Sequence, residues 1–258
     1  MGITEIDNIL MVLGVSLLMK PEERQIITRE IIRGFNDKAV EAGTKITGGQ
    51  SVMNPWPMIG GTAISVVDKK KVKFPNHAKA GDKLILTKPL GTQVCVNVVQ
   101  WYIEQKPNWE KSKDYITVEE LWKCYYTAEE SMCRLNLNAA NLMSKYQIGA
   151  CTDVTGFGIK GHCENLAKAQ KDSLKFVIHT LPIIPKMDLI NNNVFNFKLS
   201  EGYSAETSGG LLLAIDKDEA DSFIKELETL GENAWIIGEV VQGNREVEIN
   251  QYFNYIYV

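Results

Sequence analysis

The sequence has 258 residues, enough for one large or two modest domains with a buried core. Its composition, 45% hydrophobic and 23% charged, is that of a globular protein, and its formal net charge of −4 gives none of the basic excess typical of nucleic-acid-binding proteins. No apolar run reaches the length of a membrane span, and five scattered cysteines without a CxxC pair are typical of reduced thiols. We therefore expect a cytoplasmic protein whose partners include neither nucleic acid nor a membrane.

The first predicted elements are a strand and a helix. Residues 9–15 form a short apolar run, which predicts a buried strand. Pro21 and the two glutamates after it are typical of a helix start, because proline fits the first turn and acidic side chains favour the positive end of the helix dipole. Apolar residues then recur at helical spacing up to Ala42 and Gly43, where we expect the helix to end.

A glycine pair, Gly48 and Gly49, lies between this helix and the next predicted strand, residues 58–67. Successive N–H groups at such a pair can converge on phosphate oxygens, and Gln50 and Ser51 add an amide and a hydroxyl. A plain turn explains the same residues and is locally the simpler interpretation. If this loop binds a nucleotide, Gly49→Val is expected to impair binding more than folding, because a branched side chain would block the ligand's approach.

A basic connector, residues 69–79, marks the predicted domain boundary. We expect a first domain over residues 1–79 and a second over residues 80–258. Strands and helices alternate in the second domain without a G-x-G-x-x-G motif, so no dinucleotide site is predicted. The predicted strands are residues 83–87, 148–154, 176–179 and 211–215, with a final strand pair joined through Gly243 and Asn244; the predicted helices cover residues 94–101, 117–143, 159–170 and 218–230.

The segment from Cys151 to His162 combines a strand end, one carboxylate, a glycine-rich turn and a helix start. Glycines let backbone N–H groups converge, and the new helix adds a partial positive charge, so Asp153 would stand beside an anion site. Phosphate together with a divalent cation would use both features. The alternative is that Asp153 only caps the helix, and the local pattern leaves the two interpretations equally open. His162 has no partner nearby in the sequence, which favours a packed, hydrogen-bonded histidine over a catalytic one.

Five strings in one order along the chain carry a family resemblance. They are T-G-G-Q-S, K-P-L-G-T-Q, T-D-V-T-G-F-G, E-T-S-G-G-L-L and A-W-I-I-G. In them the sequence resembles selenophosphate synthetases (selenide, water dikinases), which convert selenide, ATP and water to selenophosphate, AMP and phosphate. The resemblance implies an α+β fold of two domains, similar to that of aminoimidazole ribonucleotide synthetase, with ATP at the domain junction, and it implies a homodimer.

The resemblance also implies roles for residues. Asp153 would bind Mg²⁺, and none of the five cysteines lies in the family's catalytic string. Family chains carry a Cys or selenocysteine, a Lys and further aspartates ahead of the position that aligns with Met1. We therefore expect an N-terminally incomplete chain without a catalytic residue, with an exposed sheet edge, and inactive in selenophosphate synthesis when isolated. The nucleotide contacts implied are Gly48, Gly49, Gln50 and Ser51.

Two alternatives stay open. In the first, the chain is a non-catalytic relative or fragment that serves as a nucleotide-binding or subunit-interaction module. In the second, it is another ATP-dependent enzyme of the same fold, such as a purine-pathway enzyme or a thiamine-phosphate kinase. The second of these does not account for all five strings.

Overall fold

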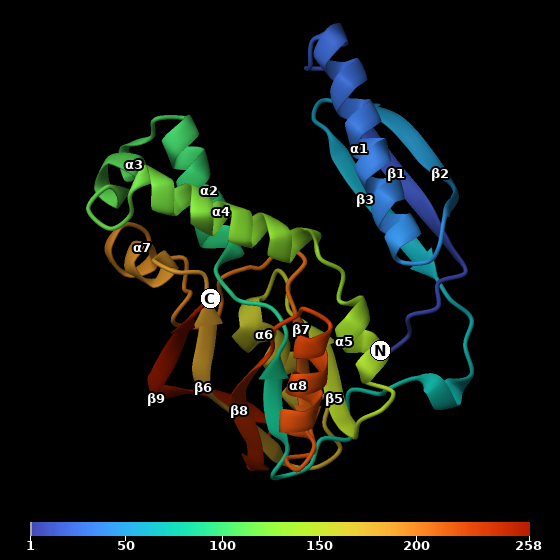
Figure 1. The fold of residues 1–258 in the computed structure, drawn as a ribbon, viewed down its shortest axis with the longest axis vertical. Coiled ribbons are helices and arrows are strands. Elements are labelled where there is room, and N and C mark those ends of the chain that lie inside the picture. Colours follow the sequence, from blue (N-terminus) through green and yellow to red (C-terminus); the bar gives the residue numbers. More distant parts are fainter. Residues whose placement is uncertain (1) are drawn as a thin grey trace. The chain divides into compact units, whose positions relative to one another are not determined.

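The computed structural model describes residues 2–258, which form two compact units, Gly2–Val72 and Lys73–Val258 (Figure 1). The point of division falls inside the predicted connector, residues 69–79. Met1, where the predicted first domain begins, lies outside the described residues. Below, the two units are called the small unit and the large unit.

The small unit is a three-stranded sheet with one long helix. Its central strand pairs in parallel with one neighbour and antiparallel with the other, in the order β2-β1-β3. The predicted first strand and the helix that begins at Pro21 are confirmed, and the helix packs on one face of the sheet (Figure 1). Its elements are β1 (Asn8–Ser16), α1 (Pro21–Glu41), β2 (Ile46–Asn54), β3 (Met58–Ile64) and a short 3-10 turn, η1 (Lys69–Lys71).

The glycine pair lies inside β2, so the predicted turn at Gly48 and Gly49 is wrong. The chain reverses earlier, at Gly43, whose φ of +74° ends α1 in a conformation that suits glycine. Ile46 is then free to pair with β1, and eight consecutive partners in β1 extend the strand to Asn54. The local sequence suggested a turn because two adjacent glycines are more frequent there than in strands.

A bulge at Thr47 sets which side chains of β2 face the helix. Ile9 pairs with Ile46, but Leu10 pairs with Gly48, so Thr47 is an extra residue on β2. From Gly48 onward the alternation is therefore shifted by one position. The buried residues Met11 and Leu13 of β1 face α1, and their partners are Gly49 and Ser51.

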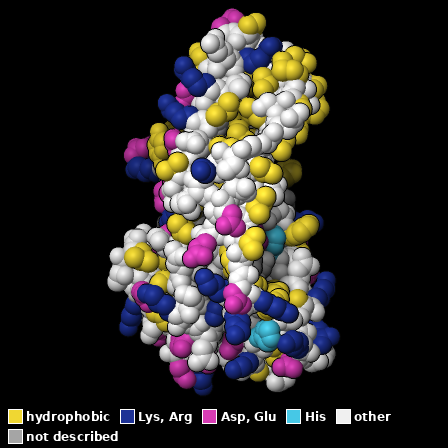
Figure 2. Space-filling model, turned by 90° about the vertical axis from the view of Figure 1, so that its right-hand side faces the viewer, with side chains coloured by type: hydrophobic (Ala, Val, Ile, Leu, Met, Phe, Trp, Pro, Cys, Tyr) yellow, Lys and Arg dark blue, Asp and Glu magenta, His cyan; other side chains and the backbone are white. Residues whose placement is uncertain are grey.

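The opposite face of this small sheet, here called the open face, is apolar and exposed. Four of its large side chains keep between 37% and 50% of their surface accessible, and hydrophobic side chains gather on the surface of the small unit (Figure 2). Such an area of exposed apolar surface is typical of an interaction surface. The open face consists of Leu10, Val12, Gly48, Gln50, Val52 and Met58.

The large unit is built on a six-stranded sheet in the order β5-β7-β4-β8-β6-β9. All neighbouring strands are antiparallel except β6 and β9, which run parallel. The predicted final pair exists as two strands, but β6 lies between them, so they do not form a hairpin. The strands are β4 (Lys83–Leu86), β5 (Ile148–Asp153), β6 (Leu174–Ile183), β7 (Leu211–Ile215), β8 (Trp235–Gln242) and β9 (Glu246–Tyr257).

Helices cover both faces of this sheet and create two cores. On β4, Leu84 and Leu86 enter one core and Ile85 enters the other, as the alternation of a strand requires. The first core holds α2, α4, α6 and α7, and the second holds α5 and α8; Figure 1 shows α6 and α8 on opposite sides of the sheet. The helices are α2 (Thr92–Ile103), α3 (Pro107–Ser112), α4 (Val118–Cys133), α5 (Leu137–Leu142), α6 (Gly158–Lys168), α7 (Met187–Asn193) and α8 (Ala220–Thr229).

A largely antiparallel sheet with helices packed against its faces confirms the predicted α+β class. The helix predicted over residues 117–143 is two helices, because Arg134 adopts an extended conformation that ends α4. All five cysteines are free. None of the helices within residues 2–258 combines the length and apolar composition that crossing a bilayer requires.

Candidate functional site

Asp153 is the last residue of β5, where the strand passes into the glycine-containing turn. Its backbone pairs with Leu211 of β7, and its side chain is exposed. Within residues 2–258 its carboxylate has no hydrogen-bond or ion-pair partner, so both oxygens are available to a ligand. The predicted order of strand, carboxylate, turn and helix is confirmed.

The turn after Asp153 requires glycine at position 158. Gly158 has a φ of +68°, and a Cβ atom there would lie 2.7 Å from the carbonyl oxygen of Ser204. A side chain would therefore be strained by the backbone angle and blocked by its neighbour. This close approach brings residues 202–210 against the turn.

Two backbone hydrogen bonds fix that contact. Val154 N donates to Gly210 O at 2.9 Å, and Glu206 N donates to Thr155 O at 3.0 Å. The turn that carries Asp153 is thus held by a segment more than fifty residues later in the chain. Its geometry depends on that segment as well as on its own sequence.

His162, in α6, contacts the same turn. Its Nε2 atom lies 3.1 Å from Thr155 Oγ1, and its ring centroid lies 5.4 Å from that of Phe157. Burial lowers the pKa of His162, and the negative charge of Asp153 opposes this shift. A packed imidazole within hydrogen-bond distance of Thr155 is the environment that the sequence analysis expects for it.

Asp153 fits Mg²⁺ as one ligand among several. Magnesium takes oxygen ligands and is commonly held by one or two carboxylates together with phosphate oxygens and water. No group of three or more His, Cys, Asp or Glu side chains among residues 2–258 is arranged to hold a metal. The unpaired carboxylate therefore supplies one oxygen donor, and phosphate and water would have to supply the others.

A groove of ≈ 320 Å³ lies beside Asp153, between β5 and α6. Its walls are largely apolar, while Asp153, Thr152 and Asn165 provide polar groups. This combination is typical of surfaces that bind small molecules. The groove is lined by Pro75, Cys151, Thr152, Asp153, Asn165, Leu166 and Ala169.

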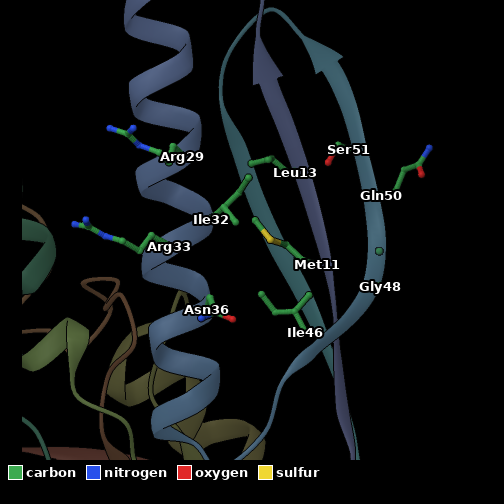
Figure 3. A pocket seen from close by; sticks show the side chains of 11 residues that line it. Met11, Leu13, Arg29, Ile32, Arg33, Asn36, Ile46, Gly48, Gln50 and Ser51 are labelled. Carbon is green, nitrogen blue, oxygen red and sulfur yellow. The ribbon is translucent and has the colours of Figure 1, made fainter.

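The predicted nucleotide-binding residues belong to the small unit. There a groove of ≈ 700 Å³ lies between α1 and the sheet, and the Gly48–Ser51 segment of β2 contributes to its lining (Figure 3). Met11, Leu13, Ile32 and Ile46 point into the space between helix and strands (Figure 3). This part of the groove is apolar.

The four predicted residues, Gly48–Ser51, alternate between the two faces of the sheet, as residues of a strand do. In Figure 3 the side chain of Ser51 points toward α1 and that of Gln50 points away from it. Gly48 shares the open face with Gln50, and a Cβ atom at position 48 would meet only Leu10 Cδ2, at an ordinary 3.6 Å. Gly49 is different, because a Cβ atom there would overlap the backbone of Met11. Gly49 is thus needed for the pairing of β1 and β2.

Four of the five cysteines are buried. Burial raises the pKa of Cys95 and of Cys151 to about 12, that of Cys124 to about 11, and that of Cys163 as well. A thiol that stays protonated is a poor nucleophile. Cys133, at the end of α4, is exposed.

Sequence reasoning missed two buried charged residues next to the Asp153 turn. Lys88 is 1% exposed and Glu206 is 4% exposed. Burial, aided by the charge of Arg134, lowers the pKa of Lys88 to about 8, and burial raises that of Glu206 to about 7. Both lie in quoted strings, K-P-L-G-T-Q and E-T-S-G-G-L-L, but their burial depends on partners far away in the sequence, so no local signal marks it.

Comparison with known proteins shows that the large unit matches a known protein family. The model of the AIR synthase related protein, C-terminal domain, matches residues 79–250. Selenide, water dikinase 2 of Homo sapiens is 47% identical over 253 residues, which are 96% of this chain and 56% of that protein. Selenide, water dikinase of Dictyostelium discoideum is 48% identical over 242 residues, 93% of this chain and 66% of that protein. The chain thus spans between about half and two thirds of the length of these relatives.

Solved structures share the fold at low sequence identity. Thiamine-monophosphate kinase from Stenotrophomonas maltophilia K279a has a TM-score of 0.70 at 15% identity, covering 96% of this chain and 73% of that one. The hydrogenase maturation protein HypE of E. coli has a TM-score of 0.68 at 17% identity, covering 96% of this chain and 71% of that one. These likenesses confirm the predicted fold.

Proposed function

The chain belongs to the AIR synthase related proteins, and from this membership we propose that it takes part in the ATP-dependent synthesis of selenophosphate from selenide and water, with AMP and phosphate as the other products. The extended identity to proteins named selenide, water dikinase supports the choice of reaction within the family. The neighbouring structure of HypE in complex with ATP supports a nucleotide as ligand of the fold.

The observation that carries the proposal is the unpaired carboxylate of Asp153 beside a glycine-bounded turn and the start of α6. Backbone N–H groups at a helix start favour phosphate oxygens, and at the start of α6 Gly158 N and Lys160 N are already used, since they donate to Thr155 O and Gly202 O. A carboxylate favours a divalent cation. A nucleotide phosphate bound with Mg²⁺ matches both groups. When bound, Mg²⁺ would neutralise the charge of the phosphate groups.

The remaining nucleotide contacts are proposed for β2. This strand lies at an edge of its sheet, so alternate N–H groups along it lack a partner strand. The absence of a side chain at Gly48 lets a ligand approach the backbone, and the outward amide of Gln50 and the hydroxyl of Ser51 add donors and acceptors. Gly49 contributes by keeping β2 close to β1.

Within this chain, the residues proposed to act on substrate bind and orient the nucleotide rather than attack it. The buried thiols of Cys151 and Cys163 have raised pKa values and are unsuited to nucleophilic attack. No residue between 2 and 258 is proposed to bind or activate selenide.

A second copy of the chain is the proposed protein partner. The open face offers exposed apolar side chains from all three strands of the small sheet. Covering such a face with an identical one would remove apolar surface from water in a symmetric dimer. The proposed location is the cytoplasm, where five free cysteines would stay reduced.

A second candidate function is a nucleotide-binding or subunit-interaction module without synthesis. Two observations favour it: residues 2–258 hold no group of three or more side chains arranged for a metal, and four thiols are buried. Incubating the purified chain with selenide, Mg²⁺ and ATP and following AMP and selenophosphate by phosphorus NMR separates the two. Selenophosphate formation would support synthesis by this chain. ATP binding without selenophosphate formation would support the module. The absence of both ATP binding and selenophosphate formation would contradict both functions.

A further inference from the structure

The carboxylate of Glu206 is buried at the start of α2. It accepts hydrogen bonds from Gly91 N at 2.7 Å, from Thr92 N at 3.0 Å and from the hydroxyl of Thr92. Gly91, the residue before α2, has no side chain with which to cap the helix, so Glu206 provides the cap from a distant segment. The carboxylate thereby fastens residues 204–210 to the helix.

The backbone on both sides of Glu206 holds the turn that carries Asp153. Glu206 N donates to Thr155 O, and the carbonyl of Gly210 accepts from Val154 N. Between these bonds Gly209 lies directly against the carbonyl of Val154, so closely that a Cβ atom would overlap it. Any shift of residues 206–210 would therefore be transmitted to the residues that follow Asp153.

Lys88 anchors the same segment at a second point. Its Nζ donates to Ser208 O at 2.8 Å and to Arg134 O at 2.6 Å. Ser208 has a φ of +50°, which is unusual for a residue with a side chain, so the segment needs external support to keep this conformation. Both anchors are ionisable groups, whose charged forms are costly to bury.

Buried charged groups with perturbed pKa values are concentrated at functional sites, where an exact geometry is required. Here the two perturbed groups, Glu206 and Lys88, both hold one short segment, residues 204–210. That segment contacts the Asp153 turn through two backbone hydrogen bonds.

We propose that Glu206 is a positioning residue, whose carboxylate holds residues 153–158 in the conformation that presents Asp153 to its ligand. The identity of that ligand, a magnesium-bound nucleotide phosphate, rests on the proposed function. The positioning itself rests only on the hydrogen bonds and close contacts described above.

The test compares Glu206→Gln with Asp188→Asn in the full chain. An amide at position 206 keeps the size of the side chain but turns an NH₂ group toward N–H donors, so the cap is weakened. Asp188 is a similarly buried carboxylate that accepts a hydrogen bond from Tyr257 and makes none to the Asp153 turn, so it serves as the matched control. Hydrogen exchange of residues 153–158 is measured by mass spectrometry, with residues 220–229 of α8 as the reference for global opening.

Glu206→Gln is expected to speed exchange in residues 153–158 by about tenfold, with no change in residues 220–229 and no effect of Asp188→Asn on residues 153–158. Thr92→Val is expected to have the same effect in weaker form, and Thr92→Ser, which restores the hydroxyl, should return exchange to the wild-type rate. Unchanged exchange in residues 153–158, or a rise equal to that in residues 220–229, would overturn the proposal.

Magnesium-dependent ATP binding, measured by calorimetry on the same variants, separates this inference from the proposed function. If Glu206→Gln exchanges faster in residues 153–158 and also loses magnesium-dependent ATP binding, the positioning role and the proposed function are both supported. Faster local exchange while Asp153→Asn binds ATP and magnesium as the wild type does supports the positioning role and contradicts the assignment of Asp153 to the metal.

Discussion

Gly49 lies so close to the backbone carbonyl of Met11 that a Cβ atom at position 49 would overlap it. The two residues are partners in the parallel pair of β1 and β2, and the φ of +138° at Gly49 adds to the demand for glycine. The sequence had suggested that this glycine serves ligand approach. The structure shows that it serves strand pairing.

The first prediction follows from that contact. Gly49→Val should destabilise the small unit by roughly 3 kcal/mol, because β1 and β2 would have to separate locally, so the expected order of effects is the reverse of the one drawn from sequence. Thermal unfolding followed by circular dichroism measures it. Gly48→Ala is the matched control, since its Cβ has room, and equal stability of the two variants would contradict the prediction.

Asp153→Asn should reduce the enhancement of ATP affinity by magnesium about tenfold, because it removes a charged oxygen ligand and leaves the backbone unchanged. Titration calorimetry with ATP, in magnesium and in EDTA, measures the enhancement. Glu164→Gln, on α6 and bonded to Tyr203, is a control that should leave it intact. If Asp153→Asn binds like the wild type in both conditions, Asp153 is not a metal ligand.

The stability of the large unit should depend on pH through Glu206. Burial raises the pKa of this carboxyl from 4.5 to about 7, so the folded state holds the proton more tightly than the unfolded state does. The contribution of Glu206 to stability is therefore fully present below about pH 4.5 and is lost as the pH rises through about 7, for a change of up to about 3 kcal/mol. The groups facing the carboxylate are the N–H groups of Gly91 and Thr92 and the Thr92 hydroxyl.

Urea unfolding of the wild type and of Glu206→Gln at pH 5 and pH 7.5 isolates this contribution, because other titrating groups are common to both proteins. The free energy of unfolding of the wild type should fall more steeply with pH than that of the variant. Parallel curves would show that Glu206 does not titrate in this range.

Cys133 should be the first thiol to react with iodoacetamide. It is exposed, whereas burial raises the pKa of Cys95 and Cys151 to about 12 and shields their sulfurs from the reagent. Mass spectrometry of the partly alkylated native chain gives the order of labelling. Early labelling of Cys151 would show that its surroundings open readily in solution and would reopen its role as a nucleophile.

Val12→Lys should lower the tendency of the chain to form dimers at least about tenfold, because it places a charge in the centre of the apolar open face. Sedimentation velocity over a range of concentrations measures the association. Glu129→Lys adds the same side chain to the exposed surface of α4 and should leave association unchanged. A dimer that survives Val12→Lys would have to use another surface.

Elements with strong local signals were predictable from the sequence. The strand Leu211–Ile215 was placed at its observed limits, since all five residues are apolar and buried, and the helix at Pro21 was marked by its proline and glutamates. The order of strand, carboxylate, turn and helix around Asp153 was predicted because each step has its own residue pattern. Here local preference and tertiary structure agree.

Features that depend on distant partners were not predictable. Gly48 and Gly49 form a strand because β1 offers a parallel partner, which no local pattern reveals. The last two strands flank β6, a placement decided by sheet topology, although the short Gly243–Asn244 link suggested a hairpin. Lys88 and Glu206 are buried because their hydrogen-bond partners lie elsewhere in the chain, so their sequence positions resembled ordinary exposed turns.

The extra residue at Thr47 makes β2 more tolerant of a deletion than of an insertion. Deleting Thr47 would leave Ile46 opposite Ile9 and Gly48 opposite Leu10, so Gln50 and Ser51 would keep their faces. One residue inserted after Gly48, with this pairing kept, would instead bring Gln50 opposite Leu13, on the α1 side of the sheet. That insertion would place an amide among the apolar side chains of Met11 and Leu13. Deletion of Thr47 is therefore expected to be tolerated better than an insertion of one residue after Gly48, and the folded yields of the two variants would show the difference.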